Sequence, residues 1–168
     1  SHYNKAQISI LRKKKLSLRP NWKKMIKIKD FWLARIKGAS KISSGTGGLL
    51  IYCRWFLLQR IEQLKLNLKY DRFIITRSDF IWNINHPKMS NLDSNFIWIP
   101  YGESYGGYTD RHAVLSKNNY YDYLNLIEPI LLEPEKLYLK MKNKNNWNLE
   151  RYIKFYLEMK GYRKKVKQ

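Results

Sequence analysis

The apolar residues of this chain recur with helical spacing in some segments and form short continuous runs in others. Residues 49–68 place leucine, isoleucine and tryptophan side chains on one broad stripe, which predicts a helix. A strand is predicted at 72–77, after one turn, from the apolar and β-branched residues 73–76, and a second is predicted from the apolar run at 96–99, which stops at Pro100. A helix followed directly by a strand favours an α/β fold.

Three further helices are predicted downstream. One covers residues 119–127, and another begins at 133–135, where a proline occupies the first turn. The third covers 149–159, with Asn148 as its N-cap and Gly161 as its terminator.

The predicted strand at 72–77 contains a continuous run of four apolar or β-branched residues, 73–76, which is typical of a strand buried on both faces in a parallel sheet. We therefore expect an α/β domain with a mostly parallel sheet flanked by helices. This single domain is predicted to span residues 21–162, after a basic arm at 1–20 and before a basic tail at 163–168. Residues 22–36 predict one more, weaker amphipathic helix.

Positive charge is concentrated at the two ends of the chain. The net charge is +20, of which residues 1–41 contribute +12 and residues 142–168 contribute +7, while 42–141 are nearly neutral at +1. Basic ends favour weak binding to an anionic surface such as phospholipid or nucleic acid. A solvated, lysine-rich surface in a compositionally biased sequence explains the same distribution equally well.

Cysteine content and hydropathy exclude several classes of protein. Cys53 is the only cysteine, so a disulfide framework and a Cys₂His₂ zinc site are excluded, and a reducing, cytoplasmic location is expected. Because Cys53 lies in an apolar segment, we expect it to be an inert packing residue. No run of about 18 uncharged apolar residues occurs, so no transmembrane helix is expected.

Charged residues follow the first predicted strand at once, as Arg77-Ser78-Asp79. Open α/β sheets bind ligands outside the carboxyl ends of their strands, so Asp79 is expected at a crevice. Its carboxylate can ligate a divalent cation or accept hydrogen bonds from sugar hydroxyls. The alternative is that Asp79 only caps the next turn.

A glycine-rich segment follows the second predicted strand. Gly102, Gly106 and Gly107 lie within six positions and predict a loop that has unusual backbone dihedrals or that lets a ligand approach closely. Asp110 comes next, and it is either a general base or the cap of a helix that follows.

Arg111 and His112 complete this segment. Arg111 can form an ion pair with a carboxylate such as Glu103, or it can bind a phosphate. His112 is either a metal ligand or a hydrogen-bonded structural residue.

Taken in order, residues 77–79 after a strand, Ile99-Pro100, and the segment 106–113 resemble small glycosyltransferases of the GT-A type. Such proteins occur in bacterial surface-polysaccharide gene clusters and in large DNA viruses. The resemblance covers roughly residues 45–161. It implies a GT-A-like fold, and for a viral protein it places the enzyme in the host cytoplasm.

The resemblance also implies an activity and a site. The activity is transfer of a sugar from a nucleotide-sugar donor to a glycan or glycoprotein acceptor. Its site residues are assigned as follows: catalytic, Asp110; donor-binding, Arg77, Asp79, Arg54 and Tyr52; acceptor or loop, Gly106, Gly107, Arg111 and Trp82; metal, Asp79 and His112. The aromatic ring of Trp82 either stacks on a sugar or belongs to the core.

One departure from the family pattern concerns the metal. Arg77 stands where the common motif has its first carboxylate, so two readings stay open. Asp79 and a donor phosphate can hold Mn²⁺ or Mg²⁺ together, or Arg77 can itself neutralise the diphosphate.

A second departure concerns the nucleotide. GT-A proteins begin with a strand that grips the base, and before residue 38 only residues 7–11 have strand character. The N-terminal nucleotide-binding part is therefore expected to be truncated or reduced. A non-catalytic sugar-binding or assembly role is one alternative. A basic nucleic-acid-binding module is another, although no RNA-recognition or zinc-finger signature accompanies the charge.

Overall fold

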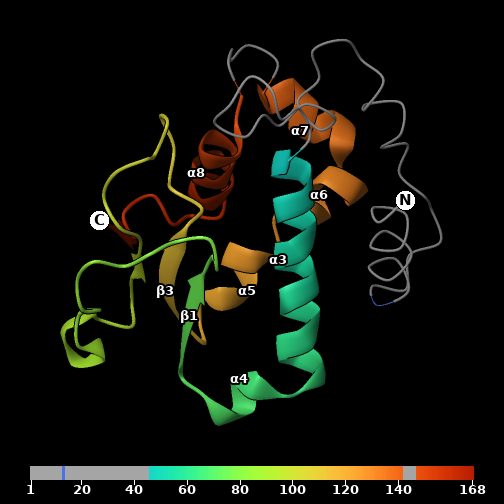
Figure 1. The fold of residues 1–168 in the computed structure, drawn as a ribbon. Helices are drawn as coiled ribbons and strands as arrows, with labels where there is room; N and C mark the ends of the chain where they lie inside the picture. The colour runs from blue at the N-terminus through green and yellow to red at the C-terminus, as the bar shows by residue number, and fades with distance from the viewer. Residues whose placement is uncertain (1–12, 14–45, 142–146) are drawn as a thin grey trace. The chain divides into compact units, whose positions relative to one another are not determined.

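The computed structural model describes residues 13, 46–141 and 147–168, which are coloured in Figure 1. The chain divides into two compact units, Ser1–Arg60 with Leu124–Leu149 and Ile61–Tyr123 with Glu150–Gln168. Apart from Lys13, the predicted basic arm and the helix expected at 22–36 lie outside the described residues. The prediction of one domain over 21–162 stays a prediction.

Helices dominate the described part of the first unit. They are α3 (Thr46–Gln63), which continues into the second unit, α6 (Ile127–Leu132) and α7 (Pro134–Met141). Proline opens α7, as predicted from its missing backbone N–H. Cys53 on α3 is exposed, so the prediction that it serves as a packing residue is wrong.

The helix predicted over 49–68 is divided in two. After α3, the chain forms the short helix α4 (Leu66–Lys69). Lys65 adopts a left-handed conformation with φ of 54°, which an ordinary helical residue does not take, and this interrupts the helix between Gln63 and Leu66.

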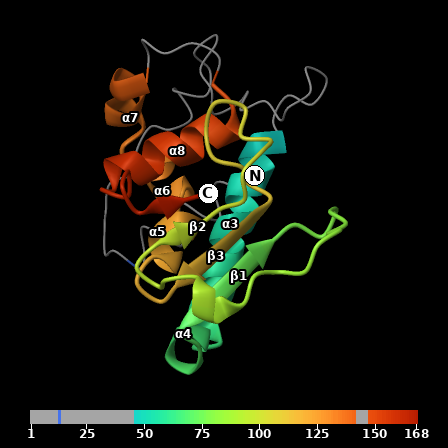
Figure 2. The same ribbon diagram turned by 90° about the vertical axis from the view of Figure 1, so that its left-hand side faces the viewer.

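A four-stranded sheet forms the centre of the second unit (Figures 1 and 2). Its strands are β1 (Arg72–Thr76), β2 (Ile97–Trp98), β3 (His112–Ser116) and β4 (Val166–Lys167), in the order β1-β3-β2-β4. β3 is antiparallel to both β1 and β2, and only β2 and β4 are parallel. The sheet is thus mixed, within an α/β architecture, and the prediction of a mostly parallel sheet is wrong.

The two faces of β1 differ in burial, which fits its antiparallel pairing with β3. Phe73 is buried, and its ring centroid lies 4.9 Å from that of Tyr120 at the start of α5 (Tyr120–Leu124). Ile74 and Thr76 point to the opposite, more exposed face. Strands with one solvated face are typical of antiparallel sheets, so the apolar run alone misidentified the environment of β1.

The predicted basic tail at 163–168 belongs partly to the sheet. The amide of Ile97 donates to the carbonyl of Lys165 at 2.8 Å, and the amide of Ile99 donates to the carbonyl of Lys167 at 2.9 Å. These hydrogen bonds attach β4 to β2, so the segment is structural as well as basic.

The last helix, α8 (Leu149–Met159), has the predicted bounds. Gly161 follows it with φ of 85°, and the amide of Tyr162 donates back to the carbonyl of Leu157 at 2.9 Å. This is the glycine-dependent termination that the sequence predicted. The described helices include none with the length and apolar character needed to cross a bilayer.

Candidate functional site

Arg77 joins the two aspartates that the sequence assigned to the site. Its amide donates to the carbonyl of Arg111 at 3.0 Å, which extends the pairing of β1 and β3 by one step. Its guanidinium donates through Nε to Oδ1 of Asp79 at 2.9 Å and through Nη2 to Oδ2 of the same carboxylate. Nη1 donates to Oδ2 of Asp110 at 3.1 Å. We call Arg77, Asp79 and Asp110 the ionic cluster.

The two carboxylates of the ionic cluster have different environments. The side chain of Asp79 is 56% exposed, whereas that of Asp110 is only 3% exposed. Hydrogen bonding to Arg77 lowers the pKa of Asp79, and the same hydrogen bonds raise the pKa of Arg77. Asp79 is therefore an accessible, ionised and oriented carboxylate, and Asp110 anchors the guanidinium from inside.

The structure corrects one reading of Asp110. The residues that follow it form strand β3 and not a helix, so Asp110 is not a helix cap. Its carboxylate pairs with Arg77 instead. Whether Asp110 is the base stays a prediction.

A second ion pair lies beside the ionic cluster. Arg111 pairs with Glu103, which was one of the two partners that the sequence suggested. The ring of Phe80 lies under both guanidinium groups, with its centroid 4.9 Å from Cζ of Arg111 and 5.5 Å from Cζ of Arg77. Phe80 was not predicted as a site residue, although its position directly after Asp79 was a usable signal.

The glycine-rich loop has the unusual dihedrals that were predicted. Positive φ occurs at Gly102 and Gly106, and also at Glu103 and Tyr105. Gly107 has a different role, because a Cβ there would lie 1.9 Å from the carbonyl oxygen of Glu150. The absence of a side chain at Gly107 thus lets the loop pack against the start of α8.

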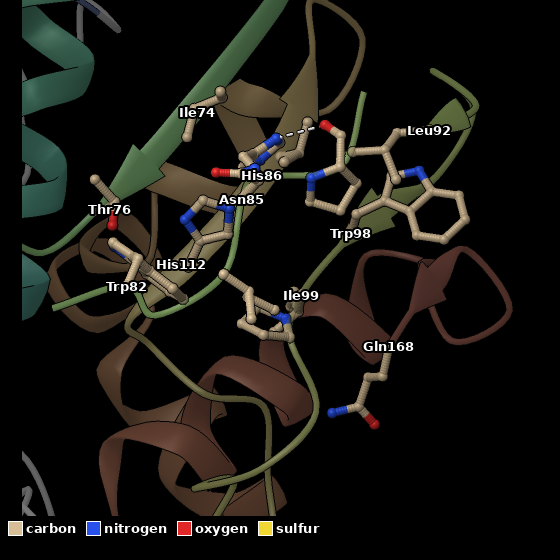
Figure 3. Close-up of a pocket in the computed structure, with 14 residues that line it drawn as sticks. Ile74, Thr76, Trp82, Asn85, His86, Leu92, Trp98, Ile99, His112 and Gln168 are labelled. Atoms are coloured by element: carbon tan, nitrogen blue, oxygen red, sulfur yellow. Dashed lines mark hydrogen bonds between the residues drawn. The ribbon is translucent and has the colours of Figure 1, made fainter. Parts of the chain in front are cut away.

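A cavity of about 560 Å³ lies on the open face of the sheet (Figure 3). Its floor comes from β1, β2 and β3, and its cover comes from the connection between β1 and β2. The lining is mostly apolar and aromatic: Ile74, Thr76, Trp82, Ile84, Asn85, His86, Pro87, Leu92, Trp98, Ile99, Pro100, His112, Val114 and Gln168.

Aromatic and imidazole rings gather at one side of this cavity. The ring centroid of His112 lies 5.0 Å from that of Trp82 and 5.3 Å from that of His86. Burial and the neighbouring His86 lower the pKa of His112, which favours the neutral imidazole. Nδ1–H of His86 donates to the carbonyl of Pro87 at 2.7 Å, while the buried Nδ1 of His112 has no hydrogen-bond partner among the described residues.

The structure distinguishes the two readings of Trp82. The residue is half exposed and lines the cavity, so it is not part of the core. Its ring centroid lies 6.2 Å from that of Phe80, which itself contacts the ionic cluster. Trp82 and Phe80 therefore connect the cavity to the ionic cluster.

Tyr52 and Arg54 lie on the part of α3 that belongs to the first unit. Arg54 is buried, and the ring centroid of Tyr52 lies 5.7 Å from that of Trp55. The other predicted site residues belong to the second unit, so donor binding by Tyr52 and Arg54 stays a prediction.

Metal binding through Asp79 and His112 stays a prediction, to which the described residues give little support. They contain no group of three or more histidine, cysteine, aspartate or glutamate side chains that could hold a metal ion. Asp79 is the accessible carboxylate, and both its oxygens already accept hydrogen bonds from a guanidinium. Mn²⁺ or Mg²⁺ would here need most of its ligands from water and substrate.

Comparisons with known proteins leave the family open. No family model matches the chain, and neither curated proteins nor solved structures give a match. The likeness to GT-A glycosyltransferases thus rests on the sequence motifs.

Proposed function

We propose that the protein is a glycosyltransferase that uses a nucleotide-sugar donor. One observation carries this proposal: Arg77 holds the exposed carboxylate of Asp79 through two hydrogen bonds and is itself anchored by the buried Asp110, beside a cavity with aromatic walls. An oriented carboxylate next to aromatic rings suits sugar recognition, because hydroxyl groups donate to the carboxylate and the apolar sugar face covers a ring.

Asp79 retains acceptor capacity toward a ligand. An ionised carboxylate has about four lone-pair sites, and Arg77 occupies two of them. The remaining sites of this exposed group can accept hydrogen bonds from the donor sugar. Two hydrogen bonds from a planar guanidinium fix the orientation of the carboxylate before the ligand arrives, which reduces the entropy cost of binding.

Arg77 is also suited to the leaving group. A guanidinium has five N–H donors, and three are used within the ionic cluster. The two others can donate to a diphosphate, whose negative charge increases as the sugar departs. Arg77 can thereby stabilise the departing diphosphate, which in the common motif is the task of a metal ion held by a carboxylate.

The same features suit a protein that binds sugars without transferring them. The burial of Asp110 favours this alternative, because a general base must reach the acceptor hydroxyl. Turnover separates the two, since only an enzyme releases a nucleoside diphosphate when donor and acceptor are mixed.

The experiment is a calorimetric titration with a panel of nucleotide sugars, each with Mn²⁺ and with EDTA. We expect at least one donor to bind, and that donor to release its nucleoside diphosphate with a suitable acceptor. Failure of every donor to bind contradicts the proposal. If the donor still binds in EDTA, the protein's own side chains and not a metal ion neutralise the donor phosphates.

A further inference from the structure

The lining of the cavity changes in polarity along the paired strands β1 and β3. Ile74 lies opposite Val114, and two residues further along Thr76 lies opposite His112. Beyond this pair comes Arg77, with its hydrogen bond to Asp110. A strand rises about 3.3 Å per residue, so each step of two residues covers about 7 Å.

Along the paired strands, the cavity thus has an apolar end at Ile74 and Val114 and a polar end at Thr76 and His112, while Gln168 after β4 is a further polar lining residue. Leu92, Trp98 and Pro100 add further apolar surface to the lining, and Figure 3 shows Ile74 and Thr76 one after the other along β1. The polar end is the one that adjoins the ionic cluster. A ligand that matches this lining has an apolar body and a polar head that points toward Asp79 and Arg77.

We propose that the cavity binds the alkyl chain of an amphiphilic acceptor, with its sugar head group held at Thr76 and His112. That the amphiphile is an acceptor rests on the proposed function, whereas its binding in the cavity does not. Apolar lining favours a chain over a free glycan, because a glycan would leave its hydroxyl groups without hydrogen bonds there. A volume of about 560 Å³ lies within the usual range for small-molecule sites.

Two polar groups at the head position are available for hydrogen bonds. The hydroxyl of Thr76 makes only long contacts, 3.4 Å to the carbonyl of Arg111 and 3.5 Å to that of Arg77. The neutral imidazole of His112 donates through one ring nitrogen and accepts through the other; its Nδ1 is buried without a protein partner within the described residues, so Nε2 is the nitrogen left for a head group. These groups fit hydroxyls of a sugar or of a lipid alcohol.

The test uses a series of alkyl β-glucosides with methyl, butyl, hexyl and octyl chains, each below its micelle concentration. Binding is measured by calorimetry and by the fluorescence of the tryptophans that line the cavity. Each methylene that the cavity buries should tighten binding about fourfold, until the chain outgrows the cavity. Equal affinity for the methyl and octyl compounds overturns the proposal.

Matched isoleucine variants locate the chain. Ile74→Ser, on the cavity floor and 48% exposed, should weaken octyl glucoside binding about tenfold. Ile84→Ser and Ile81→Ser compare two isoleucines of one loop that are 80% and 89% exposed, of which only Ile84 lines the cavity. We expect Ile84→Ser to weaken binding and Ile81→Ser to leave it unchanged. This comparison holds even where Ile74→Ser fails to fold.

The same data separate this inference from the proposed function. Octyl glucoside binding that none of the cavity variants changes overturns the inference, even if a nucleotide sugar binds and is consumed. Chain-length-dependent binding without any donor binding supports the cavity assignment and contradicts the glycosyltransferase.

Discussion

Asp110 is the buried member of the ionic cluster, and its burial decides what its replacement should do. Asp110→Asn keeps an oxygen that can accept from Nη1 of Arg77, so the protein should fold and bind the donor. If the residue acts only by holding Arg77, turnover should fall by less than about tenfold. Asp110→Ala removes the acceptor and should cost about 1–3 kcal/mol of stability.

Steady-state kinetics and thermal unfolding of both variants check this expectation. A general base contributes about 10²–10⁴-fold, so a loss of that size in Asp110→Asn with intact donor binding would establish Asp110 as the base. Such a loss would contradict the interpretation that Asp110 only holds Arg77 in position.

His112 should make stability depend on pH. Its pKa is lowered in the folded protein by burial and by His86, so the unfolded chain binds a proton more readily. The stabilising contribution of the neutral imidazole is therefore complete above the unfolded pKa of about 6.5 and is lost as the pH falls below it. We expect His112→Gln to lose less stability than the wild type between pH 7.5 and 5.5, measured by urea unfolding. An identical pH dependence in the two proteins would contradict this.

At the scale of elements, the glycine-rich loop depends on its contact with α8. Gly107→Ala would place a methyl group against the carbonyl oxygen of Glu150, so it should cost about 1–3 kcal/mol through overpacking. Gly102→Ala is the matched control, because its φ of 100° strains the backbone while nothing lies within 4 Å of the added carbon. Chemical denaturation of both variants measures the two effects, and an unaffected Gly107→Ala would exclude the packing role.

The sequence predicted the elements better than their pairing. The bounds of α8 and the start of α7 followed from local signals, namely an asparagine, a proline and a glycine at the correct places. β1 and β2 followed from apolar runs. Strand direction did not, because pairing with β3 depends on residues about 40 positions away in the sequence. β4 was not predicted, because its segment is rich in basic residues and was interpreted as a tail, although edge strands often carry lysine.

The candidate site shows the same division. Arg77 and Asp79 were recognisable because charged residues followed a strand directly, and Asp110 because it followed a glycine-rich loop. The cavity was not recognisable, because its lining combines alternate residues of separate strands with a loop that has no periodic pattern. Trp82 was noted as a sugar-stacking candidate, but its proximity to His112 required the fold.

At the scale of the whole molecule, the charge of +20 invites binding to nucleic acid. We expect weak, sequence-tolerant binding, with dissociation constants of about 10⁻⁴–10⁻⁶ M at physiological salt. Fluorescence anisotropy with duplex DNA and single-stranded RNA at several salt concentrations measures the affinity and its salt slope. Sub-micromolar binding at physiological salt would favour the nucleic-acid-binding module over the enzyme.

The structure also determines how this charge should be removed. Deleting residues 163–168 would take away β4 together with the basic residues, so lost binding could reflect lost structure. Replacing the exposed Arg163 and Lys164 by glutamine removes two charges and leaves β4 intact. The variant should show a shallower salt slope and unchanged thermal stability.

The central claim is that Asp79, held by Arg77, binds the donor sugar. Asp71 provides a matched control, because it is an exposed aspartate just before β1 that pairs with Lys117 at 2.8 Å. The most direct measurement is calorimetric titration of the best nucleotide sugar into the wild type, Asp79→Asn and Asp71→Asn. We predict that Asp79→Asn weakens binding about tenfold or more, equivalent to about 1.4 kcal/mol, while Asp71→Asn leaves it unchanged. Equal affinities in all three proteins would contradict the proposed site.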